Sequence, residues 1–267
     1  MENIQFNDID FSSLQKLKQQ GTKSTLYIDE NICYKILDGL YDEEKFDLYK
    51  KLLDMDGIKI EGVLLPKQLI VKEDKLFGYT MDYFKDSVPL SDKFIGRYID
   101  FKLILDYLLK ASRILRNIHD EKIICQDLSF ENIIVTKDGN VAFCDLDGCC
   151  YKDYISPFIS MLMKRFLVDY RQERMPLSTN LDRVSMMISF YYWIYIKEIQ
   201  DLSRREYTKL SKKIKTIDNA RIYANSLVDK STSISYIPYL DELIDISDDY
   251  VFDREKQFSL VRRLFKR

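Results

Sequence analysis

The chain has 267 residues, of which 46% are hydrophobic and 31% charged, so it can bury a large core as one big or two modest domains. Its formal net charge of −2 and a pI near 5.7 give no electrostatic reason to expect nucleic acid or a membrane surface as the main partner. The chain has a single histidine, which argues against a His-rich metal site and against a His-based catalytic triad.

The cysteines and apolar runs favour a cytoplasmic protein without a membrane span. The five cysteines show no C-x-x-C spacing, which is typical of reduced thiols rather than of a metal site or a disulfide framework. Residues 1–13 are polar and charged and lack the apolar centre of a signal peptide. The longest apolar run, 184–196, is too short to cross a bilayer and is expected to form a buried helix.

The first 84 residues predict a five-stranded sheet with one helix. Runs rich in β-branched and aromatic residues are bounded by turn signals, and the five predicted strands are 14–19, 24–28, 31–37, 63–71 and 76–84. Between the third and fourth strands, residues 42–55 carry apolar residues at helical spacing and begin with acids that suit a helix N-terminus. A single amphipathic helix is therefore expected beside the sheet.

Helices dominate the predicted second part of the chain. Residues 85–92, with one proline, read as a linker, and 101–119 form a long amphipathic helix. Further helical patterns follow at 158–170, 184–196, 204–217 and 236–246. The last fourteen residues are basic and are expected either to form a solvated helix or to dock a partner.

The densest chemistry lies around a predicted hairpin in the middle of the chain. Its strands, 133–136 and 141–144, are joined by an Asp-Gly turn. Asp127 and Asn132 precede the first strand, and Asp145 follows the second. Phosphoryl transfer uses such a layout, because the protein must hold Mg²⁺ on the phosphates and orient an attacking hydroxyl. In this interpretation Asp127 orients the nucleophile, while Asn132 and Asp145 offer oxygen ligands suited to Mg²⁺.

Three stretches resemble motifs of the protein-kinase-like superfamily. The H-R-D-L-x-x-x-N loop of that family is matched by C-Q-D-L-S-F-E-N at 125–132. Its D-F-G is matched by D-L-D at 145–147, and its V-A-I-K by I-C-Y-K at 32–35. The coupling of these motifs to a hairpin makes the resemblance much more specific than an isolated D-x-x-x-x-N.

The resemblance covers nearly the whole chain and implies an α+β, bilobal protein-kinase-like fold. A five-stranded antiparallel sheet with one helix would form the N-lobe, and the C-lobe would be mainly helical. The implied boundaries are 1–84 for the N-lobe, 85–92 for the hinge and linker, and 93–267 for the C-lobe with the catalytic loop.

The same resemblance implies that ATP and Mg²⁺ are the cofactors. Lys35 would hold the α and β phosphates and would pair with an acid of the 42–55 helix. Glu44 is the preferred partner because apolar residues follow it on the same helix face, and Glu43 is the alternative. Asp182 would anchor the backbone of the catalytic loop, and His119 is expected to form structural hydrogen bonds rather than to catalyse.

The nucleotide would be held by a lid and by a hinge. The implied lid residues are Gly21, Thr22, Lys23 and Ser24. The implied adenine contacts are Met81 as gatekeeper, the carbonyl of Asp82 and the N–H of Phe84. An alternative interpretation of residues 19–27 is a plain hairpin loop, because only one glycine occupies a loop that is glycine-rich in the family.

Several positions depart from the family pattern. Cys125 and Gln126 replace its histidine and arginine, Asp147 replaces its glycine, and no A-P-E triplet follows.

An ATP- and Mg²⁺-dependent Ser/Thr protein kinase is the leading functional hypothesis. A small-molecule kinase of the aminoglycoside or choline kinase type is an alternative, favoured by Ser129 where protein kinases carry a lysine or arginine. A nucleotide-binding pseudokinase is the third. The expected partner is thus a protein or small-molecule hydroxyl acceptor, with a further docking site on the C-lobe.

Overall fold

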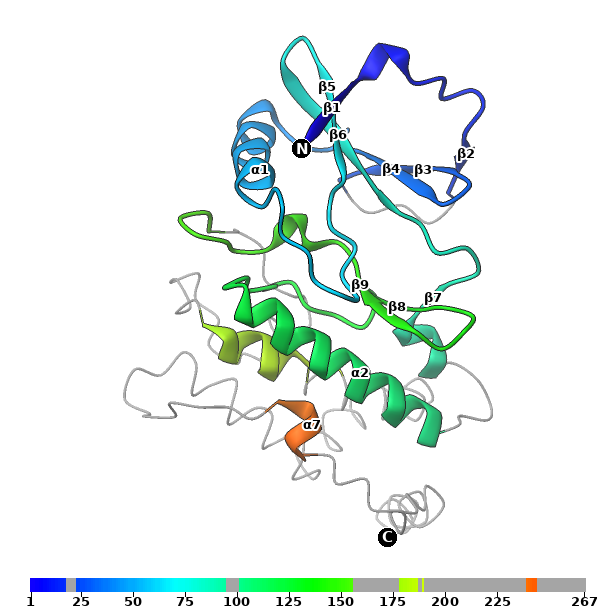
Figure 1. Cartoon of the computed structure of the whole chain (residues 1–267), viewed down its shortest axis with the longest axis vertical. Helices are drawn as coiled ribbons and strands as arrows, with labels where there is room; N and C mark the ends of the chain where they lie inside the picture. Colours follow the sequence, from blue (N-terminus) through cyan, green and yellow to red (C-terminus); the bar gives the residue numbers. More distant parts are fainter. Residues whose placement is uncertain (18–22, 95–100, 156–177, 187–188, 190–238, 244–267) are drawn as a thin grey trace, which may run out of the picture.

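The computed structural model describes residues 1–17, 23–94, 101–155, 178–186, 189 and 239–243. Over these residues the protein is a mixed α+β structure with one six-stranded sheet, one three-stranded sheet and two long helices. Figure 1 shows the larger sheet with helix α1 at one end of the molecule and helix α2 below the smaller sheet. In this part of the chain no helix is both long and apolar enough to span a membrane.

The larger sheet has the strand order β1-β5-β6-β4-β3-β2. Its strands are β1 (Glu2–Gln5), β2 (Gln15–Lys16), β3 (Thr25–Asp29), β4 (Ile32–Ile36), β5 (Gln68–Lys72) and β6 (Lys75–Asp82). The pairs β2–β3, β3–β4, β4–β6 and β5–β6 are all antiparallel. The five predicted strands are therefore present, in shorter form and in antiparallel pairs.

The predicted five-stranded antiparallel sheet is nevertheless wrong in strand number and in type. Strand β1 pairs in parallel with β5, from Glu2 opposite Gln68 to Gln5 opposite Val71, and makes the sheet six-stranded and mixed. The segment is short and polar with mostly exposed side chains, so it carries no period-two hydrophobic signal. Its place depends on the backbone groups that the edge of β5 offers for pairing.

The fourth predicted strand, 63–71, also begins later than expected, at Gln68. Pro66, which lacks an N–H, stands just before the sheet. The residues ahead of it turn to the smaller sheet instead, where the Leu64 N–H donates to the Phe143 carbonyl at 2.8 Å. This segment therefore connects the two sheets rather than extending one of them.

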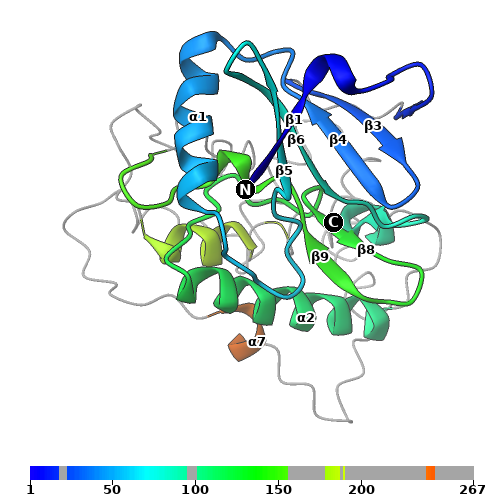
Figure 2. The same ribbon diagram turned by 45° about the horizontal axis from the view of Figure 1, so that its top comes forward.

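Helix α1 (Asp42–Asp54) begins at its three leading acids, which favour the positive end of the helix dipole. The Tyr41 N–H donates to the Glu44 carboxylate at 2.9 Å, which satisfies one backbone donor at the helix start. Leu48 and Leu52 are buried against residues of the larger sheet in one hydrophobic cluster. The helix thus covers one face of the sheet, as Figure 2 shows.

A second hydrophobic cluster surrounds helix α2 (Phe101–Asp120), which agrees with the predicted 101–119 helix. Above it lies the smaller sheet, in the order β7 (Val88–Pro89), β8 (Ile133–Val135) and β9 (Val141–Phe143). Figure 2 shows α2 running along this sheet. The predicted hairpin is confirmed, with Ile133 opposite Phe143.

Two later segments complete the described structure. Residues 179–186 are helical, and the short helix α7 (Leu240–Leu243) packs against α2. The predicted helices at 158–170 and 204–217, most of 184–196 and the basic end lie outside the described residues.

Gly78 in β6 sits where two strands approach closely. A Cβ atom added there would collide with the Lys35 carbonyl oxygen in β4 and lie 3.2 Å from Cα of Ile36. Because these are backbone atoms, any side chain at this position would push β4 away.

We predict that Gly78→Ala lowers the free energy of unfolding by roughly 1–3 kcal/mol, the usual effect of overpacking. Urea unfolding followed by circular dichroism measures this change. Gly148→Ala is the matched control, because an added Cβ there meets nothing within 4 Å. Equal midpoints for Gly78→Ala and the wild type would contradict the prediction.

Candidate active site

Lys35 is a buried lysine that forms ion pairs with two carboxylates. Strand β4 directs it to the buried face shared with Cys33, and its exposed fraction is 7%. Its Nζ atom lies 2.8 Å from Asp147 Oδ2 and also donates to Asp145 Oδ1. The Tyr79 ring centroid is 5.6 Å from the same nitrogen. A residue in the larger sheet is therefore bound to the loop that follows β9.

The three charges shift one another's pKa values. Burial lowers the pKa of Lys35, but the charges of Asp147, Tyr79 and Asp145 outweigh burial and raise it well above its usual range. Burial raises the pKa of Asp147, yet Lys35 and the hydrogen bond with Asp145 lower it to about 2. Burial is also the main cause that raises the pKa of Asp145, with Lys35 opposing it. Lys35 thus pairs with both carboxylates; the side chain of Asp147 is largely buried, whereas that of Asp145 is 48% exposed.

The backbone turns sharply at Asp145, which has φ 64° and ψ 38° in the left-handed region. The 3-10 helix Leu146–Gly148 follows directly and returns Asp147 toward Lys35. Gln126, in the loop before β8, also has a positive φ, of 60°. Non-glycine residues in this region are uncommon and cluster at functional sites.

The two motif residues Asp127 and Asn132 lie at the same end of the hairpin as Asp145. The Asn132 side-chain N–H donates to the Asp127 carbonyl at 3.1 Å. The Cys144 N–H donates to the Asn132 carbonyl at 2.9 Å, so positions 132 and 144 are directly paired across the strands. Asp145 follows at the next position.

A cavity of about 410 Å³ gathers the charged residues of the candidate site. Its polar lining is Lys23, Ser24, Lys35, Glu44, Asp47, Asp127, Asp145 and Asp147. Leu37 and Leu40, which follow β4, supply apolar walls together with Leu48 of α1 and Tyr154. The predicted lid residues Lys23 and Ser24 therefore line the same cavity as Lys35 and two of the motif acids. The other two predicted lid residues, Gly21 and Thr22, lie outside the described residues.

The predicted ion pair between Lys35 and Glu44 is wrong. Glu44 instead pairs with Lys23 at 2.8 Å, and hydrogen bonds from Lys23 and from the Tyr41 backbone lower its pKa. Glu44 belongs to the first turn of α1, where it also accepts the N-terminal backbone bond, so it points to the lid rather than to Lys35. Glu43, the alternative, is exposed and forms no ion pair with any described residue.

The implied adenine contacts are not part of this cavity. Met81 is buried in the hydrophobic cluster of the larger sheet, and the Asp82 carboxylate pairs with Lys67 at 2.5 Å. Phe84 is exposed and lines a different, wider groove together with Tyr83. The structure therefore brings Lys35, the motif acids and two of the implied lid residues to one cavity, and the implied adenine contacts lie outside its lining.

Oxygen donors of the kind that Mg²⁺ prefers are available in the site. Asp145 contributes a half-exposed carboxylate, and the amide oxygen of Asn132 lies at the same hairpin end. Within the described residues no group of three His, Cys, Asp or Glu side chains forms a complete metal site. These donors fit an ion whose remaining ligands are water and phosphate, which is the usual manner of Mg²⁺ binding.

Asp182 supports the loop from below, as the sequence predicts. Its carboxylate has no exposed surface and accepts the N–H groups of Cys125 at 2.6 Å and Gln126 at 2.8 Å. His119 Nε2 lies 3.0 Å from the same carboxylate. Since both backbone donors belong to residues just before Asp127, this buried acid holds the strained stretch in place.

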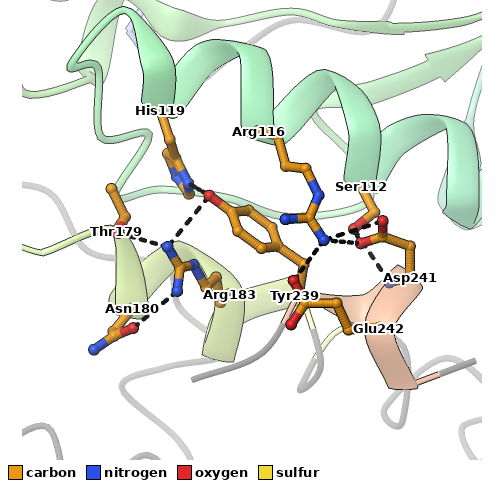
Figure 3. A network of polar contacts seen from close by, with 9 residues as sticks. All are labelled: Ser112, Arg116, His119, Thr179, Asn180, Arg183, Tyr239, Asp241 and Glu242. Atoms are coloured by element: carbon orange, nitrogen blue, oxygen red, sulfur yellow. Dashed lines mark hydrogen bonds and ion pairs between the residues drawn. The ribbon is translucent and has the colours of Figure 1, made fainter. Parts of the chain in front are cut away.

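A second layer of contacts surrounds His119, as Figure 3 shows. The Tyr239 hydroxyl lies 2.7 Å from His119 Nδ1, and its ring lies between two guanidinium groups, those of Arg116 at 4.0 Å and Arg183 at 4.1 Å. Arg116 in turn forms hydrogen bonds with Asp241 at 3.0 and 3.1 Å. Residues 239–243 are thereby tied to α2 and, through His119, to Asp182.

Sequence reasoning missed several contributors to the site. Asp147 appears in the sequence only as a departure from a glycine, and nothing local marks it as the partner of Lys35. Lys51 of α1 is buried beside Asp147, although lysines on amphipathic helices are ordinarily exposed. Tyr239 stands 120 residues from its partner His119, and no local pattern relates the two.

Comparison with other proteins does not identify a family. No model of a known protein family matches the sequence, and no curated protein does either. The chemistry of the site is therefore interpreted from its own residues: one buried ammonium and several carboxylates line a single cavity, and the amide of Asn132 lies outside that lining, bonded to the Asp127 carbonyl.

We predict that Asp182→Asn lowers the free energy of unfolding by about 1.5–3 kcal/mol, because an amide nitrogen cannot accept the bonds that a carboxylate oxygen accepts. Chemical unfolding of the two proteins measures the difference. Asp120→Asn, an exposed acid at the end of α2, is the control and should leave stability unchanged. A variant as stable as the wild type would show that the carboxylate is not needed.

Proposed function

We propose that the protein is an ATP- and Mg²⁺-dependent phosphotransferase that transfers the γ-phosphate to a hydroxyl group. The observation that carries this proposal is the contact of Lys35 with Asp145 in the cavity that Asp127 also lines. A lysine, a metal-binding acid and a second acid beside the reacting groups are the parts that phosphoryl transfer requires. The proposal includes a bilobal protein-kinase-like fold, with lobes at 1–84 and 93–267 and a linker at 85–92.

Each residue has a role that suits its surroundings. Lys35 binds phosphate oxygens, since its buried ammonium is charged across the neutral range. Asp145 and Asn132 hold Mg²⁺, which when bound neutralises charge on the phosphates. Asp127 orients the acceptor hydroxyl and takes its proton. Lys23 and Ser24 close the phosphate side, and Met81, Asp82 and Phe84 are proposed to contact the adenine.

The proposed acceptor is a serine or threonine of a protein. Asp182 supports this choice, because its carboxylate bonds to the loop backbone as the resemblance implies. Ser129 and the missing A-P-E triplet support a small-molecule acceptor as the second candidate. Labelled ATP offered with a panel of proteins and small metabolites separates them, because only one class of acceptor should become labelled.

A nucleotide-binding module without turnover is a third candidate, and one contact favours it. The carboxylate of Asp147 forms an additional ion pair with Lys35, so it competes with phosphate for the Lys35 ammonium. Binding of ATP with Mg²⁺, seen as a rise in melting temperature, without labelled product from any acceptor would support this candidate over the first two.

We predict that Asp145→Ala lowers Mg²⁺-dependent phosphotransfer by on the order of 10³-fold, because the developing charge on the phosphates loses its held metal ion. Transfer of label from ATP at saturating Mg²⁺ measures the loss. Asp153→Ala, an exposed acid in the same loop region, is the control. Undiminished transfer by Asp145→Ala would remove this residue from the reaction.

We also predict that Lys35→Met lowers phosphotransfer by roughly 10²–10³-fold while the chain still folds, because the lost ammonium is a phosphate ligand. The rate is measured with labelled ATP, and circular dichroism establishes that the variant is folded. Lys67→Met, which removes an exposed ion pair with Asp82, serves as control. Equal rates for Lys35→Met and the wild type would show that Lys35 does not take part.

A further inference from the structure

Lys51 is a buried lysine on α1 whose ammonium is surrounded by backbone carbonyls. Its exposed fraction is 2%. Its Nζ donates to the carbonyl oxygen of Asp147 and, at 3.1 Å, to that of Cys149. The same nitrogen lies 4.3 Å from the centroid of the Tyr154 ring. The Lys51 side chain therefore connects the inner face of α1, through hydrogen bonds, to the turn that contains Asp147.

Such an environment is unfavourable for a positive charge, so the buried ammonium of Lys51 points to a role other than packing. Within the described part of the chain, Lys51 forms no ion pair, and carbonyl dipoles and an aromatic ring compensate only in part for lost hydration. Burial accordingly lowers the pKa of Lys51, against the opposing effect of Cys149 and Asp147. Leu48 and Leu52 already pack this face of α1, so a hydrophobic residue would satisfy packing alone.

The contacts of Lys51 lead directly to the candidate catalytic lysine. Lys51 holds the carbonyl of Asp147, and the carboxylate of the same residue holds Lys35 at 2.8 Å. Movement of α1 would therefore shift the turn and with it the carboxylate that orients Lys35. This contact takes the place of the ion pair expected between Lys35 and Glu44, which is absent among the described residues.

We propose that Lys51 is a positioning residue for phosphotransfer, which couples the placement of α1 to Lys35 through the turn at Asp147. This inference rests on the proposed function. Lys51 does not itself line the cavity and has no contact with Asp145, but it contacts two residues that do line it, Asp147 and Tyr154, so it acts on the reaction through them. Its removal should therefore disturb the local order of that turn and the catalytic rate more than the stability of the fold.

The central test is Lys51→Met, which keeps the volume of the stem and removes the ammonium. Hydrogen exchange of the peptide spanning 145–155 should accelerate about tenfold or more, while exchange in α2 stays unchanged. The value of kcat should fall by roughly 10–100-fold, the usual effect of losing a group that orients a functional residue, with a smaller change in KM for ATP. Lys51→Arg, which keeps the charge and the donors, should recover part of the rate.

Lys50→Met is the matched control. Lys50 is the neighbouring residue on the exposed side of α1, over the Phe46 ring at 4.1 Å, and its removal should change neither exchange nor rate. A pair of variants, Asp147→Asn alone and combined with Lys51→Met, tests the route. If Lys51 acts through Asp147, the double variant loses little more rate than Asp147→Asn alone.

The outcomes separate this inference from the proposed function. Unchanged exchange at 145–155 in Lys51→Met overturns the positioning role, whether or not the wild type transfers phosphate. A wild type that transfers no phosphate overturns the function, and the exchange measurement then still decides whether Lys51 orders the turn. Equal kcat in an active wild type and Lys51→Met also overturns the proposal. If Lys51→Met does not fold, Lys51→Gln, which retains one donor, is measured with the same criteria.

Discussion

The contact between Lys35 and the acids of the 145–147 turn is the interaction on which the candidate site depends. It joins a central strand of the larger sheet to the loop after β9, across 110 residues of sequence. Removing the carboxylate partners of a buried ammonium leaves an uncompensated charge, so the Lys35 pairing favours a fixed spacing between the sheet and the hairpin. Lys35 and both of these acids line the cavity, so the ion pairs connect two of its walls.

The loop that carries Asp127 is held by a different device. The consecutive backbone N–H groups of Cys125 and Gln126 donate to the fully buried carboxylate of Asp182, and Gln126, which directly precedes Asp127, has a left-handed backbone. Such a conformation persists only where the surroundings impose it. His119 and Tyr239 extend this support to the segment at 239–243, so residues far from the cavity help to shape it.

Helix α1 contacts residues of the candidate site at two positions. Its first turn reaches the lid through Glu44 and Lys23, which are partly exposed and contribute little to stability because water screens them. Its middle reaches the 147–149 turn through Lys51, which is buried and therefore sensitive to small displacements. The helix thus contacts the cavity lining at two places, through a partly exposed ion pair at its first turn and through a buried lysine in its middle.

The sequence by itself determined the local elements, and its motifs indicated the residues that line the candidate site. Helical spacing predicts α1 and α2 to within a residue, the Asp-Gly turn predicts the β8–β9 hairpin, and the motif positions predict that Lys35, Asp127 and Asp145 share a site. The helices and the hairpin follow from periodicity and turn chemistry, which act over a few residues, whereas the shared site of the three side chains was implied by the resemblance of the motifs to a known superfamily.

Only the tertiary structure decided which charges meet and how the sheet is completed. Strand β1 adds in parallel because an edge was available, and Lys35 pairs with Asp147 rather than Glu44 because the turn after Asp145 returns its carboxylate to the ammonium. The partner of a buried charge depends on distances between segments far apart in sequence, and no local pattern contains those distances.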